Sequence, residues 1–148
     1  SFWYSLNTTA LGTPARALVS AFAPEGAIES ALAGVFDPAP VPDGYAEHLG
    51  IGLSLRRESQ ANNNRQVNAL LDHVTEMQPD YPALTLPIEM LHGDEDTTVG
   101  LDIHSRRFVG EVASARLQVI DGAGHMLQHT HLPEVQAAIA RARRRAGL

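Results

Sequence analysis

The chain has 148 residues, a formal net charge of −6 and 11 basic residues, all of them arginine. Its one dense basic stretch, residues 141–145, is too small for the basic face that nucleic-acid binding requires, so we expect no nucleic-acid partner. No apolar run reaches the roughly 18 residues of a membrane helix, so no membrane partner is expected either. The absence of cysteine fits a reducing compartment, and we expect the cytoplasm.

Residues 1–78 have the pattern of a mainly helical segment. An alanine-rich stretch predicts a first helix that ends near Pro24, and apolar residues at helical spacing predict a second one that runs to about residue 35. Three prolines within residues 37–44 favour an extended connector. Residues 60–78 give the clearest helix, because their apolar residues fall on one face. These residues are Val67, Leu70, Leu71, Val74 and Met77.

Residues 79–148 alternate between strand-like and helical segments. Residues 84–91 are mostly apolar without clean alternation, as expected for a strand that is covered on both faces, and residues 117–120 predict a second strand. We expect helices over residues 101–113 and from Pro133 onward. A strand–helix–strand unit of this length forms a parallel pair with a right-handed crossover. The sequence therefore predicts an α/β fold with two parallel strands and flanking helices.

Two polar turns follow the two predicted strands. Residues 93–96 (Gly-Asp-Glu-Asp) come after the first strand, and residues 122–125 (Gly-Ala-Gly-His) come after the second. The carboxyl ends of parallel strands open on the same edge of a sheet, where α/β proteins bind their ligands. A carboxylate at that edge can orient a histidine, which gives two of the three members of a nucleophilic triad. The pattern therefore predicts a contact between Asp96 and His125.

The two turns also resemble those of the α/β-hydrolase fold family. Residues 86–99 resemble the family's acid strand and turn, in which an apolar strand is followed by Gly, two variable residues and Asp. Residues 122–125 resemble its histidine turn, and residues 132–135 resemble the start of its last helix. The resemblance covers about residues 80–142. It implies that the fold is the C-terminal part of an α/β-hydrolase sheet, preceded by a helical lid.

By the same resemblance, residues 1–78 would be the lid and residues 79–148 the C-terminal part of the hydrolase core. Apolar residues of the lid suggest a small-molecule substrate with an apolar portion, although core packing explains most of them equally well. They are Phe2, Trp3, Leu18, Phe22, Phe36 and Tyr45. Two parallel strands do not form a stable sheet alone, and both predicted strands look fully buried. We therefore expect a partner, which would be the N-terminal half of the same hydrolase as a separate fragment or chain.

The resemblance implies that Asp96 is the acid and His125 the general base of a Ser-His-Asp triad that hydrolyses an ester or similar bond. Asp96 would accept a hydrogen bond from one ring nitrogen of His125 and fix its tautomer. No serine of the chain lies in Gly-x-Ser-x-Gly or follows an apolar strand, and the family's nucleophile precedes the acid. We expect the serine to lie outside this chain, which alone would be close to inert. The resemblance implies no cofactor, because the reacting groups all come from protein.

Other interpretations remain open at this point. Without a nucleophile, the chain could be a non-catalytic, hydrolase-like binding module, and an aspartate nucleophile would make it a relative of epoxide hydrolases or dehalogenases. Asp96 alone could be a turn or capping carboxylate, and Asp94 is the more natural cap. His125, His129 and His131 follow glycines and precede a proline, which makes a helical zinc motif doubtful, and the acidic turn lacks the glycine of a calcium loop. We therefore expect no metal.

Overall fold

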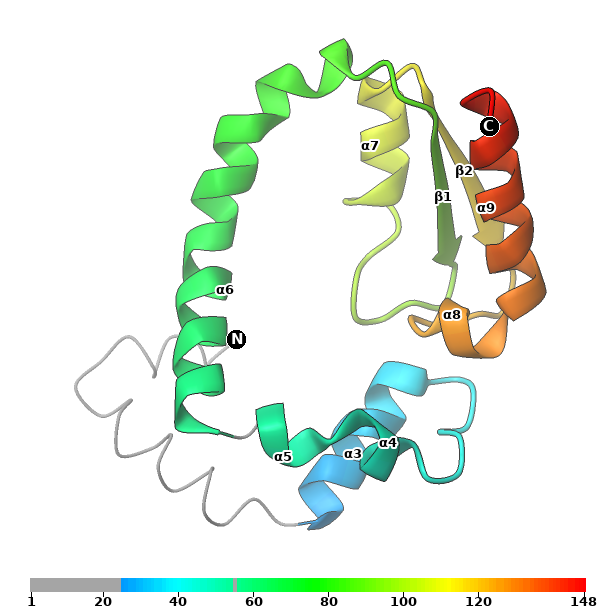
Figure 1. Cartoon of the computed structure of the whole chain (residues 1–148). Helices are drawn as coiled ribbons and strands as arrows, with labels where there is room; N and C mark the ends of the chain where they lie inside the picture. Colours follow the sequence, from blue (N-terminus) through cyan, green and yellow to red (C-terminus); the bar gives the residue numbers. More distant parts are fainter. Residues whose placement is uncertain (1–24, 55) are drawn as a thin grey trace. The chain divides into compact units, whose positions relative to one another are not determined.

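The computed structural model describes residues 25–54 and 56–148, which divide into two compact units (Figure 1). Residues 25–31 and Pro42–Gln78 belong to the first unit, and Leu32–Val41 and Pro79–Leu148 form the second. The first predicted helix, which ends near Pro24, lies outside the described residues. So do Phe2, Trp3, Leu18 and Phe22, four of the residues expected to contact a substrate.

The described part of the first unit is helical, as its sequence predicts. Its helices are α3 (Glu25–Phe36, whose last five residues count with the second unit), α4 (Tyr45–Leu49), α5 (Ile51–Ser54) and α6 (Arg57–Met77). The connector over residues 37–44 contains neither helix nor strand. Helix α6 begins three residues before the predicted position, and Gln78–Ala83 follow it as a short 3-10 helix, η1.

The second unit is a two-stranded parallel sheet flanked by helices, so the predicted fold class is confirmed (Figure 1). The strands are β1 (Ile88–Gly93) and β2 (Ala115–Ile120), and the helices are α7 (Ser105–Glu111), α8 (Leu127–Thr130) and α9 (Leu132–Arg145). The register pairs Ile88 with Ala115 and Gly93 with Ile120, so the two strands end level with each other. Both strand ends therefore deliver their turns to one edge of the sheet.

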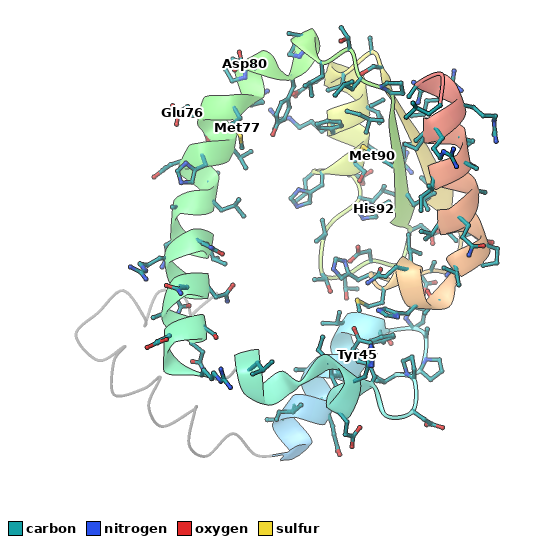
Figure 2. The ribbon with its side chains drawn as sticks, viewed as in Figure 1. Tyr45, Glu76, Met77, Asp80, Met90 and His92 are labelled. Carbon is teal, nitrogen blue, oxygen red and sulfur yellow. The ribbon has the colours of Figure 1, made fainter. Side chains whose placement is uncertain are left out.

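The side chains of β1 alternate between the two faces of the sheet and show which face each helix covers. Successive side chains of a strand point to opposite faces. His92 contacts Ser105 of α7, and Figure 2 places Met90, two residues away, on the same side of β1. Glu89 contacts Arg141 of α9. Helices α7 and α9 thus cover opposite faces of the sheet, and the residue before the strand's last glycine faces the crossover helix.

Three details of the predicted strands and helices are wrong. Strand β1 begins at Ile88 rather than at residue 84, because Pro87 has no N–H to donate to a ladder. Helix α7 is shorter than the predicted residues 101–113, since the acid turn continues to residue 104. The strands are mostly half-buried, and Val119 of β2 is 38% exposed, because the described residues contain no further strand beside this pair.

A cluster of ion pairs fastens α9 to β1. Arg141 Nε lies 2.8 Å from Glu89 Oε2, and Arg145 Nη1 lies 2.7 Å from Glu89 Oε1. The Glu89 side chain is only 5% exposed, and its pKa lies below the ordinary value, chiefly because Arg141 donates a hydrogen bond to it. Arg141 and Arg145, in the basic stretch of residues 141–145, are therefore paired with a buried carboxylate. Their sequence position near a helix end gave no sign of the acidic partner on β1.

Two glycines allow backbone segments of the second unit to touch. A Cβ atom at Gly93 would lie 2.0 Å from the carbonyl oxygen of Ala123, and one at Gly124 would lie 1.9 Å from the carbonyl oxygen of Asp37. Phe36, next to Asp37, is fully buried and its ring lies 5.8 Å from that of His129. For Phe36 the structure shows the core packing that also explains an apolar lid residue, since its ring packs inside the second unit.

We predict that Gly93→Ala destabilises the protein by about 3 kcal/mol, the upper end of the range for overpacking, because the clash is with a backbone atom that cannot rotate away. The matched control is Gly110→Ala in α7, where nothing lies within 4 Å of the new methyl group. Alanine is the better helix former, so this control should be neutral or stabilising by up to about 1 kcal/mol. Urea unfolding of the three proteins measures the difference, and equal stability of the two variants would contradict the close approach.

We also predict that Glu89→Gln lowers the free energy of unfolding at pH 7 by about 1 kcal/mol, since it removes charge-assisted hydrogen bonds to two partly exposed arginines. The folded-state pKa of Glu89 lies below its ordinary value of 4.5. Its contribution is therefore present above about pH 4.5 and is lost as the pH falls through the folded-state pKa. Denaturant unfolding between pH 3 and 7 should show a shallower acid loss for Glu89→Gln. The exposed control Glu76→Gln should follow the unsubstituted protein, and an unchanged acid loss in Glu89→Gln would argue against the cluster.

Candidate active site

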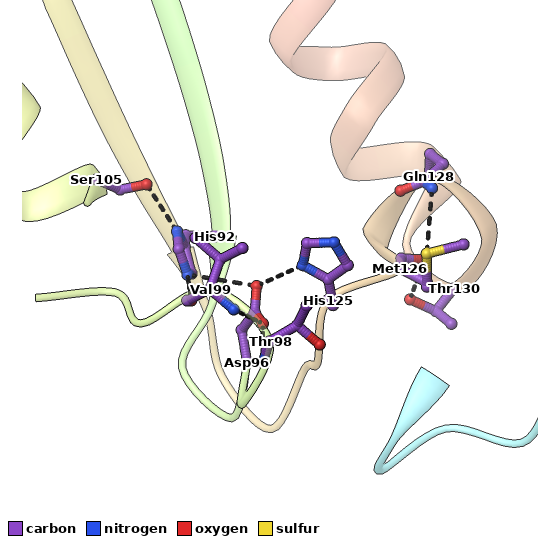
Figure 3. A network of polar contacts seen from close by, with 9 residues as sticks. All are labelled: His92, Asp96, Thr98, Val99, Ser105, His125, Met126, Gln128 and Thr130. Carbon is purple, nitrogen blue, oxygen red and sulfur yellow. Dashed lines mark hydrogen bonds and ion pairs between the residues drawn. The ribbon is translucent and has the colours of Figure 1, made fainter. Parts of the chain in front are cut away.

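Asp96 and His125 lie just beyond the carboxyl ends of the two strands. Asp96 comes three residues after Gly93, the last residue of β1, and His125 comes five residues after Ile120, the last residue of β2. His125 Nδ1 lies 2.9 Å from Asp96 Oδ2 (Figure 3). The predicted contact between these two side chains is therefore confirmed, and it follows from the level ends of a parallel pair.

The carboxylate of Asp96 is held on both oxygens. Oδ1 accepts hydrogen bonds from the backbone N–H groups of Thr98 (2.9 Å) and Val99 (2.8 Å), and Oδ2 faces the His125 ring. The two interpretations of Asp96, as a turn carboxylate and as a partner of His125, are thus both correct in geometry. One oxygen builds the turn while the other is left for the imidazole.

Asp96 is an ionised group in spite of its burial. Its side chain is 6% exposed, and burial by itself would raise its pKa. The hydrogen bonds from Val99, His125 and Thr98 outweigh that effect and hold the pKa of Asp96 below its ordinary value of 3.8. A carboxylate at neutral pH only accepts hydrogen bonds. The hydrogen between the two side chains therefore belongs to Nδ1 of His125.

His125 is the more accessible member of the pair, with 35% of its side chain exposed. Because Nδ1 of the neutral ring carries the hydrogen, Nε2 has the lone pair. Among residues 25–54 and 56–148, no side chain or backbone group forms a hydrogen bond with this Nε2. The arrangement gives a base whose tautomer is fixed on one side and whose basic nitrogen can take up a proton on the other.

The acid turn and the histidine turn are also joined directly to each other. Gly122 donates its N–H to Asp94 Oδ1 at 2.7 Å, and Glu95 donates its N–H to the carbonyl oxygen of Ala123 at 3.0 Å. The expectation that Asp94 caps a helix is therefore wrong. Its carboxylate holds the backbone of the second turn, which helps to keep Asp96 and His125 in register.

Two further residues, His92 and Ser105, belong to the site and were missed by the sequence analysis. The buried His92 ring lies 2.6 Å from Ser105 Oγ through Nδ1 and 2.8 Å from the Val99 carbonyl oxygen through Nε2 (Figure 3). Both residues line a cavity of about 170 Å³ that Asp96 and His125 also line. The sequence signal that could have found His92 was a histidine at the end of a mostly apolar strand, four residues before the acid Asp96.

The other histidines near the site have local roles. His129 stacks at a tilt against Phe36, and His131 Nδ1 lies 2.9 Å from Thr130 Oγ1. Within the described residues, no group of three or more His, Cys, Asp or Glu side chains is arranged to hold a metal ion. No helix in that part of the chain is both long and apolar enough to cross a membrane.

Comparison with known proteins finds a similarity over part of the chain. No protein-family model matches the chain, and no solved structure matches it. The chain is 27% identical over 62 residues to "Putative non-heme chloroperoxidase" from Synechocystis sp., a match that covers 42% of this chain and 22% of that relative. The matched segment thus spans about a fifth of the relative's length. Such chloroperoxidases are α/β-hydrolase family proteins, so the similarity supports a hydrolase-like origin for this chain.

We predict that Asp96→Asn reverses the tautomer of His125. The carbamoyl group can still accept from Thr98 and Val99 through its oxygen, which leaves its NH₂ facing His125 Nδ1. Nδ1 must then accept, and the hydrogen moves to Nε2. Long-range ¹H–¹⁵N spectra of the imidazoles, recorded where the rings are neutral, distinguish the two tautomers. Asp94→Asn is the matched control and should leave His125 in the Nδ1–H form; the same form in Asp96→Asn would refute the assignment.

Proposed function

We propose that Asp96 and His125 are the acid and the general base of a hydrolase active site that cleaves an ester or similar bond. The nucleophile would be a serine in a part of the complete protein outside these 148 residues. The observation that carries the proposal is the 2.9 Å contact of His125 Nδ1 with a buried, ionised carboxylate at the carboxyl edge of parallel strands. The similarity to an α/β-hydrolase family protein supports the same conclusion.

In this mechanism His125 moves protons in two half-reactions. Nε2 takes the hydroxyl proton of the serine as its oxygen attacks the carbonyl carbon, and the imidazolium is stabilised by Asp96. It then gives that proton to the leaving alkoxide oxygen, which leaves an acyl-enzyme. A water attacks the acyl carbon while Nε2 takes one of its protons, and return of the proton to the serine oxygen releases the carboxylic acid. Positioned proton transfer of this kind contributes about 10²–10⁴-fold in rate.

We propose that the chain consists of a lid followed by part of a hydrolase core, as the resemblance to the α/β-hydrolase family implies. Residues 1–78 would form a lid that contacts the apolar portion of the substrate, and residues 79–148 would form the C-terminal part of the core. Further strands, from the N-terminal half of the hydrolase, would extend the β1–β2 pair. The incompletely buried strand residues, among them the exposed Val119, support this arrangement, because added strands would cover them. Without that half, the chain would be close to inert.

The decisive experiment uses the complete protein, treated with a fluorophosphonate probe that reacts with catalytic serines. We predict one labelled serine outside these 148 residues, identified by intact mass and peptide mapping. His125→Ala should lower the turnover of p-nitrophenyl esters by at least about 10²-fold, because the base is lost. His73→Ala, which removes an exposed imidazole on α6, should leave turnover unchanged.

An unlabelled protein would contradict the serine mechanism and favour an aspartate nucleophile or a binding module. Equal turnover in the unsubstituted protein and His125→Ala would remove His125 from the chemistry. The name of the Synechocystis relative makes peroxide-dependent chlorination a second candidate activity, so the same proteins should be assayed for it with chloride and hydrogen peroxide.

A further inference from the structure

We propose that His92 is a positioning residue of this site. From its place on β1, it would hold the acid turn so that Asp96 presents Oδ2 to His125. The catalytic consequence of this inference rests on the proposed function, whereas its structural content does not. It is carried by the contacts of one buried imidazole of β1 with two other parts of the second unit, the acid turn and α7.

Both ring nitrogens of His92 are used, and the partners determine the tautomer. The Val99 carbonyl oxygen, 2.8 Å from Nε2, can only accept a hydrogen bond, so Nε2 carries the hydrogen. In the neutral ring Nδ1 is then an acceptor, and the Ser105 hydroxyl, 2.6 Å away, donates to it. A ring held in one tautomer by two short hydrogen bonds has little freedom to rotate, which is a property of a scaffold.

The effect of His92 reaches Asp96 through the backbone of Val99. The carbonyl group of Val99 accepts from His92, while its N–H donates to Asp96 Oδ1 at 2.8 Å. One residue of the turn is therefore fixed at both of its polar groups. The same His92 Nε2 lies 3.5 Å from Asp96 Oδ2, too far for a good hydrogen bond but close enough to place a positive N–H edge beside the carboxylate.

Ser105, His92 and Asp96 lie side by side in space as the members of a Ser-His-Asp triad do. Their geometry nevertheless favours a structural role. The Ser105 hydroxyl is buried at the start of α7, and its bonding partner is the ring of His92. The Nε2–H of His92 is directed to the Val99 carbonyl rather than to the carboxylate, at 2.8 Å against 3.5 Å. The hydroxyl therefore serves to orient the ring.

The test compares His92→Phe, which keeps a ring but removes both hydrogen bonds, with His92→Gln, which can keep a donor near the position of Nε2. The control Met90→Leu changes the same side of β1 two residues away. Amide exchange of Val99 and the imidazole Nδ1–H signal of His125 are measured by NMR. We expect at least tenfold faster Val99 exchange and loss of the Nδ1–H signal in His92→Phe, with partial recovery in His92→Gln and no change in Met90→Leu.

Retention of both signals in a folded His92→Phe would overturn the proposal. If that variant does not fold, Ser105→Ala replaces it: it removes one anchor of the ring without adding bulk, and unchanged Val99 exchange would again overturn the proposal. In the complete protein, His92→Phe should lower kcat for p-nitrophenyl esters by at least tenfold with little change in KM. Absence of turnover in the unsubstituted protein would count against the proposed function alone, because the NMR measurements need no substrate.

Discussion

The close approach of two backbone turns is the constraint on which the rest of the site depends. The carbonyl oxygen of Ala123 occupies the space that a side chain at residue 93 would need. Because Gly93 leaves that space open, the two turns lie near enough for Asp94 to accept from Gly122 and for Glu95 to donate to Ala123. These links set the distance between Asp96 and His125, the side chains that follow. Any side chain at residue 93 would push the turns apart.

Within that frame, the chemistry follows from how a buried carboxylate is stabilised. Removing a charge from water is unfavourable unless hydrogen bonds replace the lost hydration. Asp96 obtains them from two backbone N–H groups on one oxygen and from the imidazole on the other, and the net result is a lowered pKa. The turn therefore does more than place a residue. It keeps Asp96 ionised, which in turn fixes the tautomer of His125 and leaves its second nitrogen basic.

The sequence was informative wherever a local pattern determines the outcome. Apolar runs, a proline and polar turns predicted the α/β class and the meeting of Asp96 with His125, because a crossover of fixed hand brings successive strand ends to one edge. His92 and Ser105 were missed, since their pairing depends on which residue the crossover helix begins with. The partners of Glu89 were missed for a similar reason, because they lie more than 50 residues away along the chain. Strand burial depends on neighbouring strands and could not be judged from two segments. The catalytic roles and the lid stay predictions.

The most direct test of the account is a crystal structure of the complete protein with its reactive serine modified by a fluorophosphonate. The account predicts that His125 Nε2 lies within about 3 Å of the modified serine oxygen, while Nδ1 still contacts Asp96. Such a structure would show the nucleophile, the base and the acid joined by successive hydrogen bonds. A modified residue whose nearest base is another histidine, or an Asp96–His125 pair turned away from the adduct, would contradict the central claim.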